Sequence, residues 1–529
     1  MWWKVLNMAL VTAYSFGEII KELDNIISSI EPKKFKETRW FRKKADDLIG
    51  VELVDYGVLE YKPDERLVIP AVVSFHMQDR VNNTGYEELY YLPLVINKNY
   101  DEKCLLLLEI ENTSYTAYVY EGIYSLEYNR VLDEFVKREG SLEMEKGGYL
   151  QAELLNYYNN VTRSYSLTEV SSNSLALIER SSIIKTYRKM VPGVNPDLEI
   201  GLSLIRETGF RNFPEIKGYV SYQKNNINYD ICLIEQYVNN EGDVWAYTQR
   251  FLSRYLHYVS DNPGKDSLFT YLDPFIEEME YLGEVIGELH LSLSGIEQDN
   301  FKPRKPTLAE IEAWHEEVQQ NTELLFKLLK KNKNNINNDY NYYRVLNMVL
   351  DKEKTIFGAV KRIFGLKDSL GKYMRVHGDL HLEQILKTED DFMVLDFEGE
   401  PLKSIQHRRM KYSPLKDIAG MMRSFNYAGY AGYFDFVKKN QGINDRGRFI
   451  KAISLWEEEA RTSFLTGYQN KIRENNGDFL PPEDKFDQVL ALFKIEKALY
   501  EGIYEINNRP DWLHIPLQGI LDCVEEIAD

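Results

Sequence analysis

Cysteine, long apolar runs and an excess of positive charge are all missing from this sequence of 529 residues. The three cysteines, Cys104, Cys232 and Cys523, are scattered without metal-ligand spacing, which argues against a disulfide framework and against a zinc site. This use of cysteine favours a reducing compartment. No uninterrupted run of eighteen apolar residues follows the N-terminal stretch, so we expect no transmembrane helix.

The charge balance is acidic, with 64 Lys and Arg against 83 Asp and Glu and a formal net charge of −19. A surface of this sign argues against binding nucleic acid phosphates or anionic lipid. The apolar first twenty residues are interrupted by Asn7 and Tyr14, and no small-residue cleavage site follows them. We therefore expect a cytoplasmic protein with no membrane and no nucleic acid partner.

The chain is long enough to divide into two or three domains. Apolar alternation marks strands in the first part, and two further strand pairs around one helix give the order of a kinase small lobe. Helical periodicity dominates from Trp245 onward. We predict an α+β, bilobal protein-kinase-like fold with an additional N-terminal α/β cap. The predicted domains are the cap (1–125), a small β-rich nucleotide-binding lobe (126–240) and a large, mostly helical lobe (241–529).

One segment, VHGDLHLEQILKTEDDFMVLDFEGEP at 376–401, carries the groups that phosphoryl transfer requires. Asp379 falls on a loop, where its carboxylate could accept a hydroxyl proton. Gln384 offers an amide oxygen to a metal ion five residues later, and Asp396 ends an apolar strand, the usual place for a Mg²⁺ ligand. The pattern parallels the kinase catalytic loop and the metal-binding Asp-Phe-Gly. It predicts a kinase that uses ATP and Mg²⁺.

Two other interpretations of this segment stay open on the sequence alone. Asp379 and Asp396 can cap turns while His377 and His381 satisfy buried backbone groups. The run GDLH also resembles the first metal motif of metallophosphoesterases, and its two histidines are separated by i, i+4. Such a hydrolase needs further metal motifs downstream, and the remaining histidines lie in no such context.

The β-rich segment supplies candidate nucleotide ligands. Lys185 ends the apolar strand SSIIK, and Glu199 on the following helix could pair with it as in kinases. No G-x-G-x-x-G or Walker loop precedes this lysine, so a serine-rich turn is expected to hold phosphate and the end of the last hairpin to meet adenine. The other predicted nucleotide ligands are Ser172, Asn173, Ser174, Glu235, Tyr237 and Val238. A pseudokinase-like binding module is the non-enzymatic alternative, against which the intact Lys185, Asp379 and Asp396 argue.

Several segments together resemble the bacterial and archaeal maltokinase family. They are ETRWFRKK, RVHGDLHLEQIL, DFEGEP, YSPLKDIAGMMRSFNYAGYA and EKALYEGIYEINNRPDWLHIPLQGI, and the resemblance extends over nearly the whole chain. It implies Mg²⁺-dependent phosphorylation of maltose by ATP to maltose 1-phosphate, which feeds glycogen and trehalose metabolism. It also suggests a functional association with a trehalose synthase.

The resemblance assigns roles to single residues. Asp379 takes the catalytic position, Gln384 and Asp396 take the metal positions, and Lys185 takes the nucleotide position. One helix face carries a lysine and two tyrosines at helical spacing, which suits the stacking and hydrogen bonding of a sugar. The predicted substrate ligands are His381, Glu398, Lys497, Tyr500 and Tyr504. We interpret Arg408 and Asp417 as structural supports of the metal-binding strand.

The sequence departs from the family pattern at two places. Arg42 and Lys43 replace the glycine-bearing part of the cap motif, and Glu383 stands where the family usually has glycine. Kinases of the same superfamily act on glucosamine, aminoglycosides or choline. A kinase for another small sugar or amino sugar, such as glucosamine, is therefore the alternative to a maltokinase.

Overall fold

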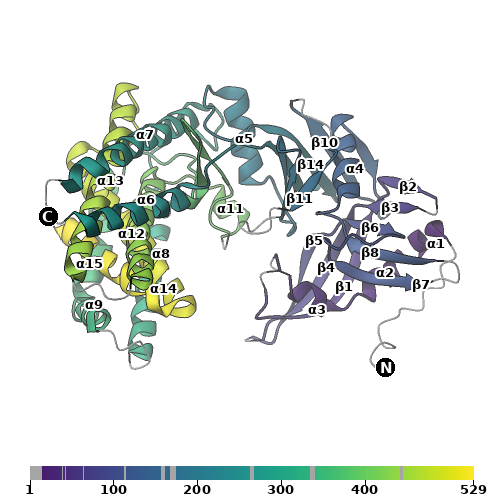
Figure 1. Ribbon diagram of the computed structural model, residues 1–529, viewed down its shortest axis with the longest axis horizontal. Helices are drawn as coiled ribbons and strands as arrows, with labels where there is room; N and C mark the ends of the chain where they lie inside the picture. The colour runs from purple at the N-terminus through teal and green to yellow at the C-terminus, as the bar shows by residue number, and fades with distance from the viewer. Residues whose placement is uncertain are drawn as a thin grey trace. The chain divides into compact units, whose positions relative to one another are not determined.

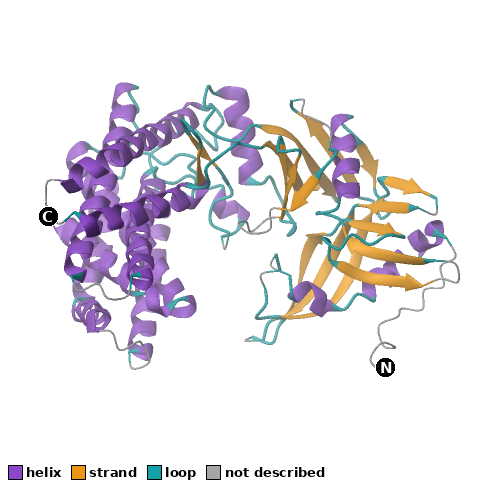
Figure 2. Ribbon diagram, in the orientation of Figure 1, coloured by secondary structure: helices purple, strands orange, loops and turns teal. Residues whose placement is uncertain are grey.

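The chain is divided by its contacts into an N-terminal unit (1–201 and 214–238) and a C-terminal unit (202–213 and 239–529). Figures 1 and 2 show that strands predominate in the first unit and helices in the second. This confirms the α+β prediction with a β-rich N-terminal and a helical C-terminal region. The predicted boundary between cap and small lobe falls inside the N-terminal unit and stays a prediction. The computed structural model describes residues 15–38, 40, 41, 43–63, 65–80, 82–111, 115–156, 161–166, 174–262, 267–333, 340–401, 403–440 and 445–528.

The described part of the N-terminal unit contains three antiparallel sheets, with the strand orders β1-β4-β5, β2-β3-β6-β8-β7 and β11-β12-β13-β15-β14-β10-β9. The elements are α1 (Phe16–Lys21), α2 (Leu23–Ser28), α3 (Pro32–Lys36), β1 (Asp47–Tyr56), β2 (Glu60–Lys62), β3 (Arg66–Ile69), β4 (Ala71–Gln78), β5 (Gly85–Tyr91), β6 (Leu94–Asn97), β7 (Leu106–Glu111), β8 (Thr116–Glu121), α4 (Leu126–Lys137), β9 (Ser141–Glu143), β10 (Tyr149–Leu154), β11 (Ser164–Ser166), β12 (Ser174–Ile178), β13 (Ser182–Thr186), β14 (Ile216–Lys224) and β15 (Ile227–Gln236). Helix α5 (Pro196–Glu207) runs from the first unit into the second.

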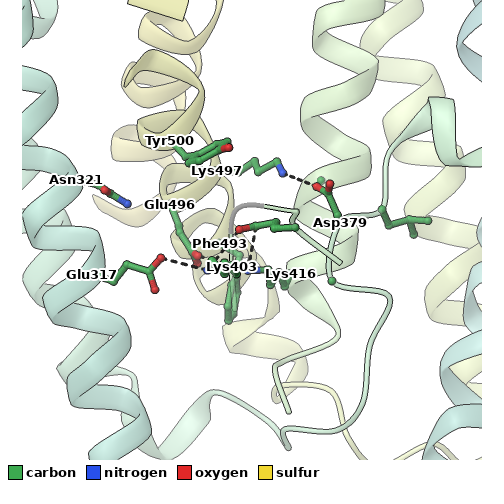
Figure 3. Close-up of a pocket in the computed structure, with 13 residues that line it drawn as sticks. Glu317, Asn321, Asp379, Lys403, Lys416, Phe493, Glu496, Lys497 and Tyr500 are labelled. Atoms are coloured by element: carbon green, nitrogen blue, oxygen red, sulfur yellow. Dashed lines mark hydrogen bonds and ion pairs between the residues drawn. The ribbon is translucent and has the colours of Figure 1, made fainter. Parts of the chain in front are cut away.

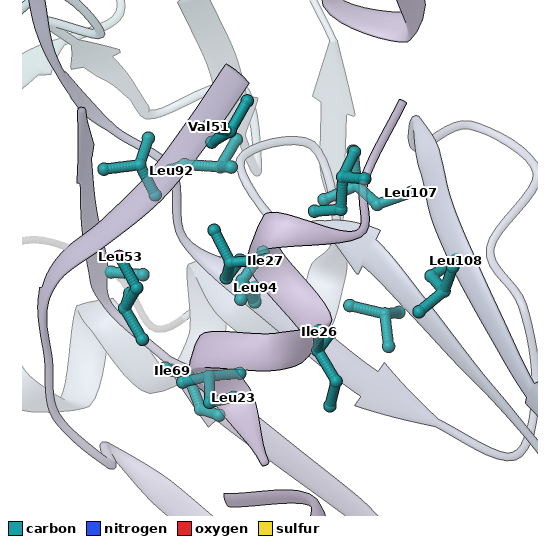
Figure 4. Packing of buried hydrophobic residues seen from close by; sticks show 14 of the residues in the cluster. Leu23, Ile26, Ile27, Val51, Leu53, Ile69, Leu92, Leu94, Leu107 and Leu108 are labelled. Atoms are coloured by element: carbon teal, nitrogen blue, oxygen red, sulfur yellow. The ribbon is translucent and has the colours of Figure 1, made fainter. Parts of the chain in front are cut away.

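The first core of the N-terminal unit forms where α2 packs on strands (Figure 4). Leu23, Ile26 and Ile27 recur at i, i+3 and i+4, so they share one face of α2. That face packs in the same cluster as Leu53 and Ile69, and none of the five side chains is more than 2% exposed. Burial of this apolar surface is the main force that holds α2 on the sheets.

The longest sheet contains the strand that carries Lys185, with Leu175 opposite on β12 and Leu233 opposite on β15. Its β14–β15 hairpin closes through Asn225 and Asn226, which have φ of 52° and 62°. Positive φ at both turn positions matches the twist of the flanking strands, and asparagine tolerates it better than most residues. The hairpins and the helix expected in this region are therefore present.

The C-terminal unit is mostly helical. Its elements are α6 (Val244–Asp261), α7 (Ser267–Gly295), α8 (Leu308–Asn332), α9 (Tyr340–Asp351), α10 (Glu353–Gly365), η1 (Lys367–Ser369), η2 (Leu382–Gln384), β16 (Ile385–Lys387), β17 (Phe392–Val394), α11 (Ile405–Arg408), α12 (Leu415–Lys439), α13 (Arg446–Glu474), η3 (Glu483–Lys485), α14 (Phe486–Asn508), η4 (Pro510–Trp512) and α15 (His514–Ala528). Among the helices described, none combines the length and the apolar character needed to cross a membrane.

Two glycines let α7 and α13 come into backbone contact. A Cβ on Gly283 would lie 2.0 Å from the carbonyl oxygen of Phe464, and a Cβ on Gly467 would lie 2.0 Å from that of Glu280. Any larger residue would force the helices apart, because cores are packed as densely as organic crystals. The helix pair in turn holds two buried side chains, Tyr468 of α13 and His290 of α7, in a hydrogen bond of 2.9 Å.

Candidate active site

A buried aspartate at the start of α12 holds the loop that contains the predicted catalytic residue. Asp417 Oδ2 accepts a hydrogen bond from the backbone N–H of His377, and Oδ1 accepts one from Gly378, both at 2.8 Å. His290 Nε2 donates a third hydrogen bond at 3.1 Å. Burial raises the pKa of Asp417, but the bond and charge of His290 and the amide of Gly378 outweigh it, so the pKa lies below its usual value. Asp417 is a structural support, as expected, although it supports the loop rather than the strand.

The same loop also packs directly on the backbone of α12. A Cβ on Gly420 would lie 2.3 Å from the carbonyl oxygen of Leu380, so only glycine permits this approach. Ser424, one turn further along the helix, accepts a hydrogen bond from the N–H of Leu382 at 3.1 Å. Gly378 has φ of 88°, the left-handed region that favours glycine. The sequence around Asp379 is thus held at several points on one helix.

His377 connects the loop to the predicted metal-binding segment. Its Nε2 donates to the carbonyl oxygen of Leu395 at 2.8 Å, and its Nδ1 accepts from the N–H of Asp379 at 3.4 Å. These partners place a hydrogen on Nε2 and make Nδ1 the acceptor. Gln384 Nε2 in turn donates to Asp396 Oδ2 at 3.2 Å. The two predicted metal ligands therefore lie side by side.

The predicted metal-binding segment follows a two-stranded sheet of β16 and β17. Asp396, two residues after β17, has φ of 60°, a conformation that aspartate adopts more readily than most non-glycine residues. Arg408 donates to the carbonyl oxygen of Glu398 at 3.1 Å and lies 3.6 Å from its carboxylate. Arg408 thus supports this segment, as expected, and the substrate contact of Glu398 stays a prediction.

A pocket lies beside Asp379, and Figure 3 shows its lining side chains. Lys497 reaches from α14 to Asp379, with 3.0 Å between Nζ and Oδ1. Tyr500 also lines the pocket, whereas Tyr504 lies one helical turn beyond the lining. The lining residues are Glu317, Asn321, Gly378, Asp379, Leu380, Glu400, Lys403, Lys416, Gly420, Phe493, Glu496, Lys497 and Tyr500.

Charged side chains of both signs alternate around this pocket. Lys403 lies 3.1 Å from Glu317, and Lys416 lies 3.3 Å from Glu400. Burial raises the pKa of Glu400, but Lys416, Lys497 and Lys403 outweigh it and lower the pKa to about 2. For Lys497, burial acts in the opposite direction and lowers the pKa. The negative charges of Asp379 and Glu400 outweigh burial, so the pKa of Lys497 lies above its usual value. The lining therefore presents charged donors and acceptors, which suits a ligand rich in hydroxyl or amino groups.

His381 is neutral at physiological pH. Burial lowers its pKa, the nearby Lys497 lowers it further, and the opposing charge of Asp379 does not compensate, so the pKa is about 4. The side chain is not part of the pocket lining. Its assignment as a substrate ligand stays a prediction.

In the N-terminal unit, Lys185 is buried and forms an ion pair with Asp197. Their side chains are 6% and 3% exposed, and Nζ lies 2.6 Å from Oδ2. The hydroxyl of Tyr187 donates to the same oxygen at 2.9 Å. The sequence analysis did not anticipate Asp197, which lies in the first turn of α5 two residues before Glu199. The predicted pairing of Glu199 with Lys185 stays a prediction. A nucleotide contact of Glu199 stays a prediction.

Two of the other predicted nucleotide ligands have backbone or side-chain partners that restrict their role. The Ser174 side chain is 1% exposed, and its hydroxyl oxygen accepts a hydrogen bond from Arg188, so it faces the interior rather than the phosphate turn. The N–H of Tyr237 donates to the carbonyl oxygen of Ser181 at 3.0 Å and cannot also donate to adenine. Adenine contacts of Glu235 and Val238 stay predictions, and Ser172 and Asn173 lie outside the described residues.

Most of the pocket wall was not anticipated from the sequence. Glu400 stands within the run DFEGEP and could have been found there, because it follows the predicted metal ligand Asp396 by four residues. Glu317 and Asn321 come from α8, about sixty residues before the catalytic loop, and no local pattern connects them to it. Asp197 carried a detectable signal as a second acid in the first turn of α5.

Comparison with known proteins supports a kinase fold. No protein-family model matches the chain. Glucosamine kinase of Streptacidiphilus jiangxiensis is 25% identical over 152 residues, which is 28% of this chain and 32% of that protein. Glucosamine kinase of Mycolicibacterium smegmatis (strain ATCC 700084 / mc(2)155) is 20% identical over 361 residues, 67% of this chain and 79% of that protein.

Solved structures named glucosamine kinase match at greater length. A complex with glucosamine, ADP and inorganic phosphate has a TM-score of 0.63 and 14% identity, and covers 94% of this chain and 98% of that one. Crystal form B has a TM-score of 0.65 with the same identity and coverage. The chain therefore has the α+β kinase-like fold of these proteins. These relatives do not support the maltokinase family, or the glycogen and trehalose metabolism, that the resemblance implied.

Proposed function

We propose that this protein transfers a phosphoryl group from ATP to a small sugar and that its substrate is an amino sugar of the glucosamine type. The observation that carries the proposal is the position of Asp379, which lines a polar pocket beside Lys497 on a loop whose other end brings Gln384 against Asp396. The fold shared with glucosamine kinases and the relatives of that name support it.

Each of these residues has a separate role in the proposed phosphoryl transfer. Asp379 accepts the proton of the attacking sugar hydroxyl, and Lys497 holds its carboxylate in place at the pocket wall. Gln384 and Asp396 would hold Mg²⁺, which prefers oxygen ligands and would neutralise charge on the transferred phosphate. Lys185, oriented by Asp197, is assigned to the nucleotide phosphates.

The acidic wall of the pocket favours an amino sugar. Glu317, Asn321 and Glu496 line it from α8 and α14. The carboxylate of Glu317 is paired with Lys403 on one side but is still 49% exposed. An exposed carboxylate accepts a charge-assisted hydrogen bond from an ammonium group, which is stronger than one from a hydroxyl. Glucosamine offers such a group and maltose does not.

Maltose is the second candidate. It is favoured by the shared face of Lys497, Tyr500 and Tyr504 on α14, where two aromatic rings follow the lysine at helical spacing. Glycogen synthesis, trehalose metabolism and a trehalose synthase partner would follow only if maltose is the substrate.

An ADP-release assay with a panel of free sugars tests the proposal. We expect Mg²⁺-dependent turnover of glucosamine, and little turnover of N-acetylglucosamine because its nitrogen carries no charge. Asp379→Asn should lower kcat by about 10²–10⁴, the range for loss of a general base. Asp368→Asn, the same change at an exposed aspartate of the same unit, serves as the control. If no sugar in the panel causes release of ADP, or if Asp379→Asn shows normal turnover, the proposal is contradicted.

A further inference from the structure

Aromatic side chains continue from the pocket past the end of α14. Tyr500 lines the pocket, and Tyr504 lies one turn further along the same helix face. The guanidinium carbon of Arg509 lies 5.5 Å from the ring centroid of Tyr504 and 5.2 Å from that of Trp512. The Trp512 and Phe434 ring centroids are 6.4 Å apart. We name these five side chains the aromatic ridge.

One end of the aromatic ridge lies beside Lys497, the lysine that contacts Asp379. Lys497 Nζ lies 3.0 Å from Asp379 Oδ1 and 5.7 Å from the ring centroid of Tyr500. The ridge therefore begins next to the pocket that contains Asp379.

The ridge is also unusually exposed. Tyr500, Tyr504 and Phe434 are 36%, 45% and 39% exposed. Within the described part of the C-terminal unit, only two other tyrosine, phenylalanine or tryptophan rings are exposed to this degree, Tyr281 and Phe364. Large rings are normally buried because each removes much apolar surface from water. Their concentration beside a pocket therefore indicates a surface that binds a ligand.

Arg509 is held rigidly between its two rings. Glu505, which is 1% exposed, accepts hydrogen bonds from Arg509 Nε at 2.9 Å and from Nη2 at 2.6 Å. The hydroxyl of Tyr427 donates to the same carboxylate at 3.3 Å, and the Tyr427 ring stacks on Trp512 with an interplanar angle of 12°. Nη1 makes none of the hydrogen bonds described for Arg509, whose side chain is 50% exposed. A fixed guanidinium therefore offers donors to a ligand at little cost in conformational entropy.

This combination fits a sugar ring. Its C–H face can stack on tyrosine, and its hydroxyls can bond to the guanidinium and the phenol oxygens. A nucleic acid base would also stack, but the net charge of −19 disfavours a polyanion. We propose that the aromatic ridge is a second subsite, which binds a sugar ring joined to the ring held beside Asp379. The preferred substrate is then a disaccharide or longer saccharide. This inference rests on the proposed function.

A kinetic comparison of one-ring and two-ring substrates tests the subsite. We would measure kcat/KM for chitobiose against glucosamine and for maltose against glucose. In the wild-type protein the two-ring sugar of the phosphorylated pair should be preferred about tenfold, and Tyr504→Ala and Phe434→Ala should each reduce this preference several-fold. Phe364→Ala removes an equally exposed ring on α10 and should leave the preference unchanged. A wild-type protein that prefers the single ring would overturn the inference, as would variants that slow both substrates equally.

Calorimetric binding of the same four sugars without ATP separates this inference from the proposed function. If no sugar is phosphorylated but a disaccharide binds more tightly than its monosaccharide, and Tyr504→Ala removes the difference, the subsite stands and the kinase proposal fails. If glucosamine is phosphorylated but neither disaccharide binds more tightly than its monosaccharide, the kinase proposal stands and the subsite is refuted. Because Tyr504 and Phe434 are both exposed, thermal unfolding should show that either variant is folded.

Discussion

Replacing Asp417 by asparagine tests how the fold controls the catalytic loop. Each carboxylate oxygen accepts a hydrogen bond from a different loop amide, that of His377 or that of Gly378. Asparagine has one acceptor oxygen, so in either orientation its NH₂ group faces a backbone N–H. If the amide oxygen takes the Oδ2 position, it keeps the hydrogen bonds from His290 and His377, and the N–H of Gly378 loses its acceptor. A backbone N–H can only donate, so one amide is left unsatisfied in either orientation.

The loss of stability and activity in Asp417→Asn can be estimated from the one backbone N–H that loses its acceptor. One buried donor without an acceptor costs about 1–3 kcal/mol, so the free energy of unfolding of the C-terminal unit should fall by that amount. The loop can relieve the cost only by moving, which displaces Asp379. A displacement of about 1 Å at a reacting group costs about 10² in rate. We therefore expect kcat to fall about 10²-fold, with a smaller change in KM for the sugar because the wall on α8 and α14 is unaltered.

Urea unfolding and steady-state kinetics measure the two effects. Asp435→Asn is a matched control on the same helix, since Asp435 is exposed and pairs only with Lys439 among the contacts described. The pKa of Asp417 is lower in the folded chain than in the unfolded one, so its stabilisation is complete above the unfolded value near 3.8 and is lost as the pH falls through the folded value. The difference between Asp417→Asn and wild type should therefore shrink in acid. An Asp417→Asn protein with wild-type kcat and unfolding midpoint would refute the reasoning.

Three further predictions concern other parts of the molecule. Lys185→Met removes the ammonium group that pairs with the buried Asp197 and should destabilise the N-terminal unit by about 3–5 kcal/mol and weaken ATP binding, measured by urea unfolding and calorimetry. Lys189→Met, at a 49% exposed side chain, should do neither. Gly467→Ala should lower the free energy of unfolding by at least about 1–3 kcal/mol, because its Cβ would meet a backbone carbonyl of α7. Gly358→Ala, in the open middle of α10, should raise the free energy of unfolding by up to about 1 kcal/mol. Equal shifts of the thermal unfolding midpoint in the two variants would contradict this prediction. The pKa of His381 is lowered from 6.5 to about 4, so between these values the unfolded chain binds a proton that the folded chain does not. The free energy of unfolding should therefore decrease as the pH is lowered from 6.5 to about 4. His381→Gln should flatten this part of a plot of urea midpoint against pH.

Local spacing was sufficient to bring two of the candidate site residues together. Gln384 and Asp396 are twelve residues apart, and a two-stranded sheet between them returns the chain on itself, so the sequence pattern alone placed them together. Periodicity likewise predicted that Lys497 and Tyr500 share a face of one helix, because a helix repeats every 3.6 residues. Strand pairs around α5 were predictable for the same reason.

Contacts between elements could not be predicted in this way. Lys497 meets Asp379 across 118 residues, and Asp417 meets the loop amides across about forty. The ion pair of Lys185 with Asp197 also depends on packing, since sequence spacing alone does not say how the acids in the first turn of α5 are oriented.

The amino-acid sequence by itself determined the α+β composition and the candidate reacting groups, because these depend on residue type and short spacing. Only the tertiary structure decided which groups surround Asp379 and which aromatic rings follow the pocket along α14. Those features depend on how helices pack, as at Gly420, where the absence of a side chain lets the catalytic loop rest on α12.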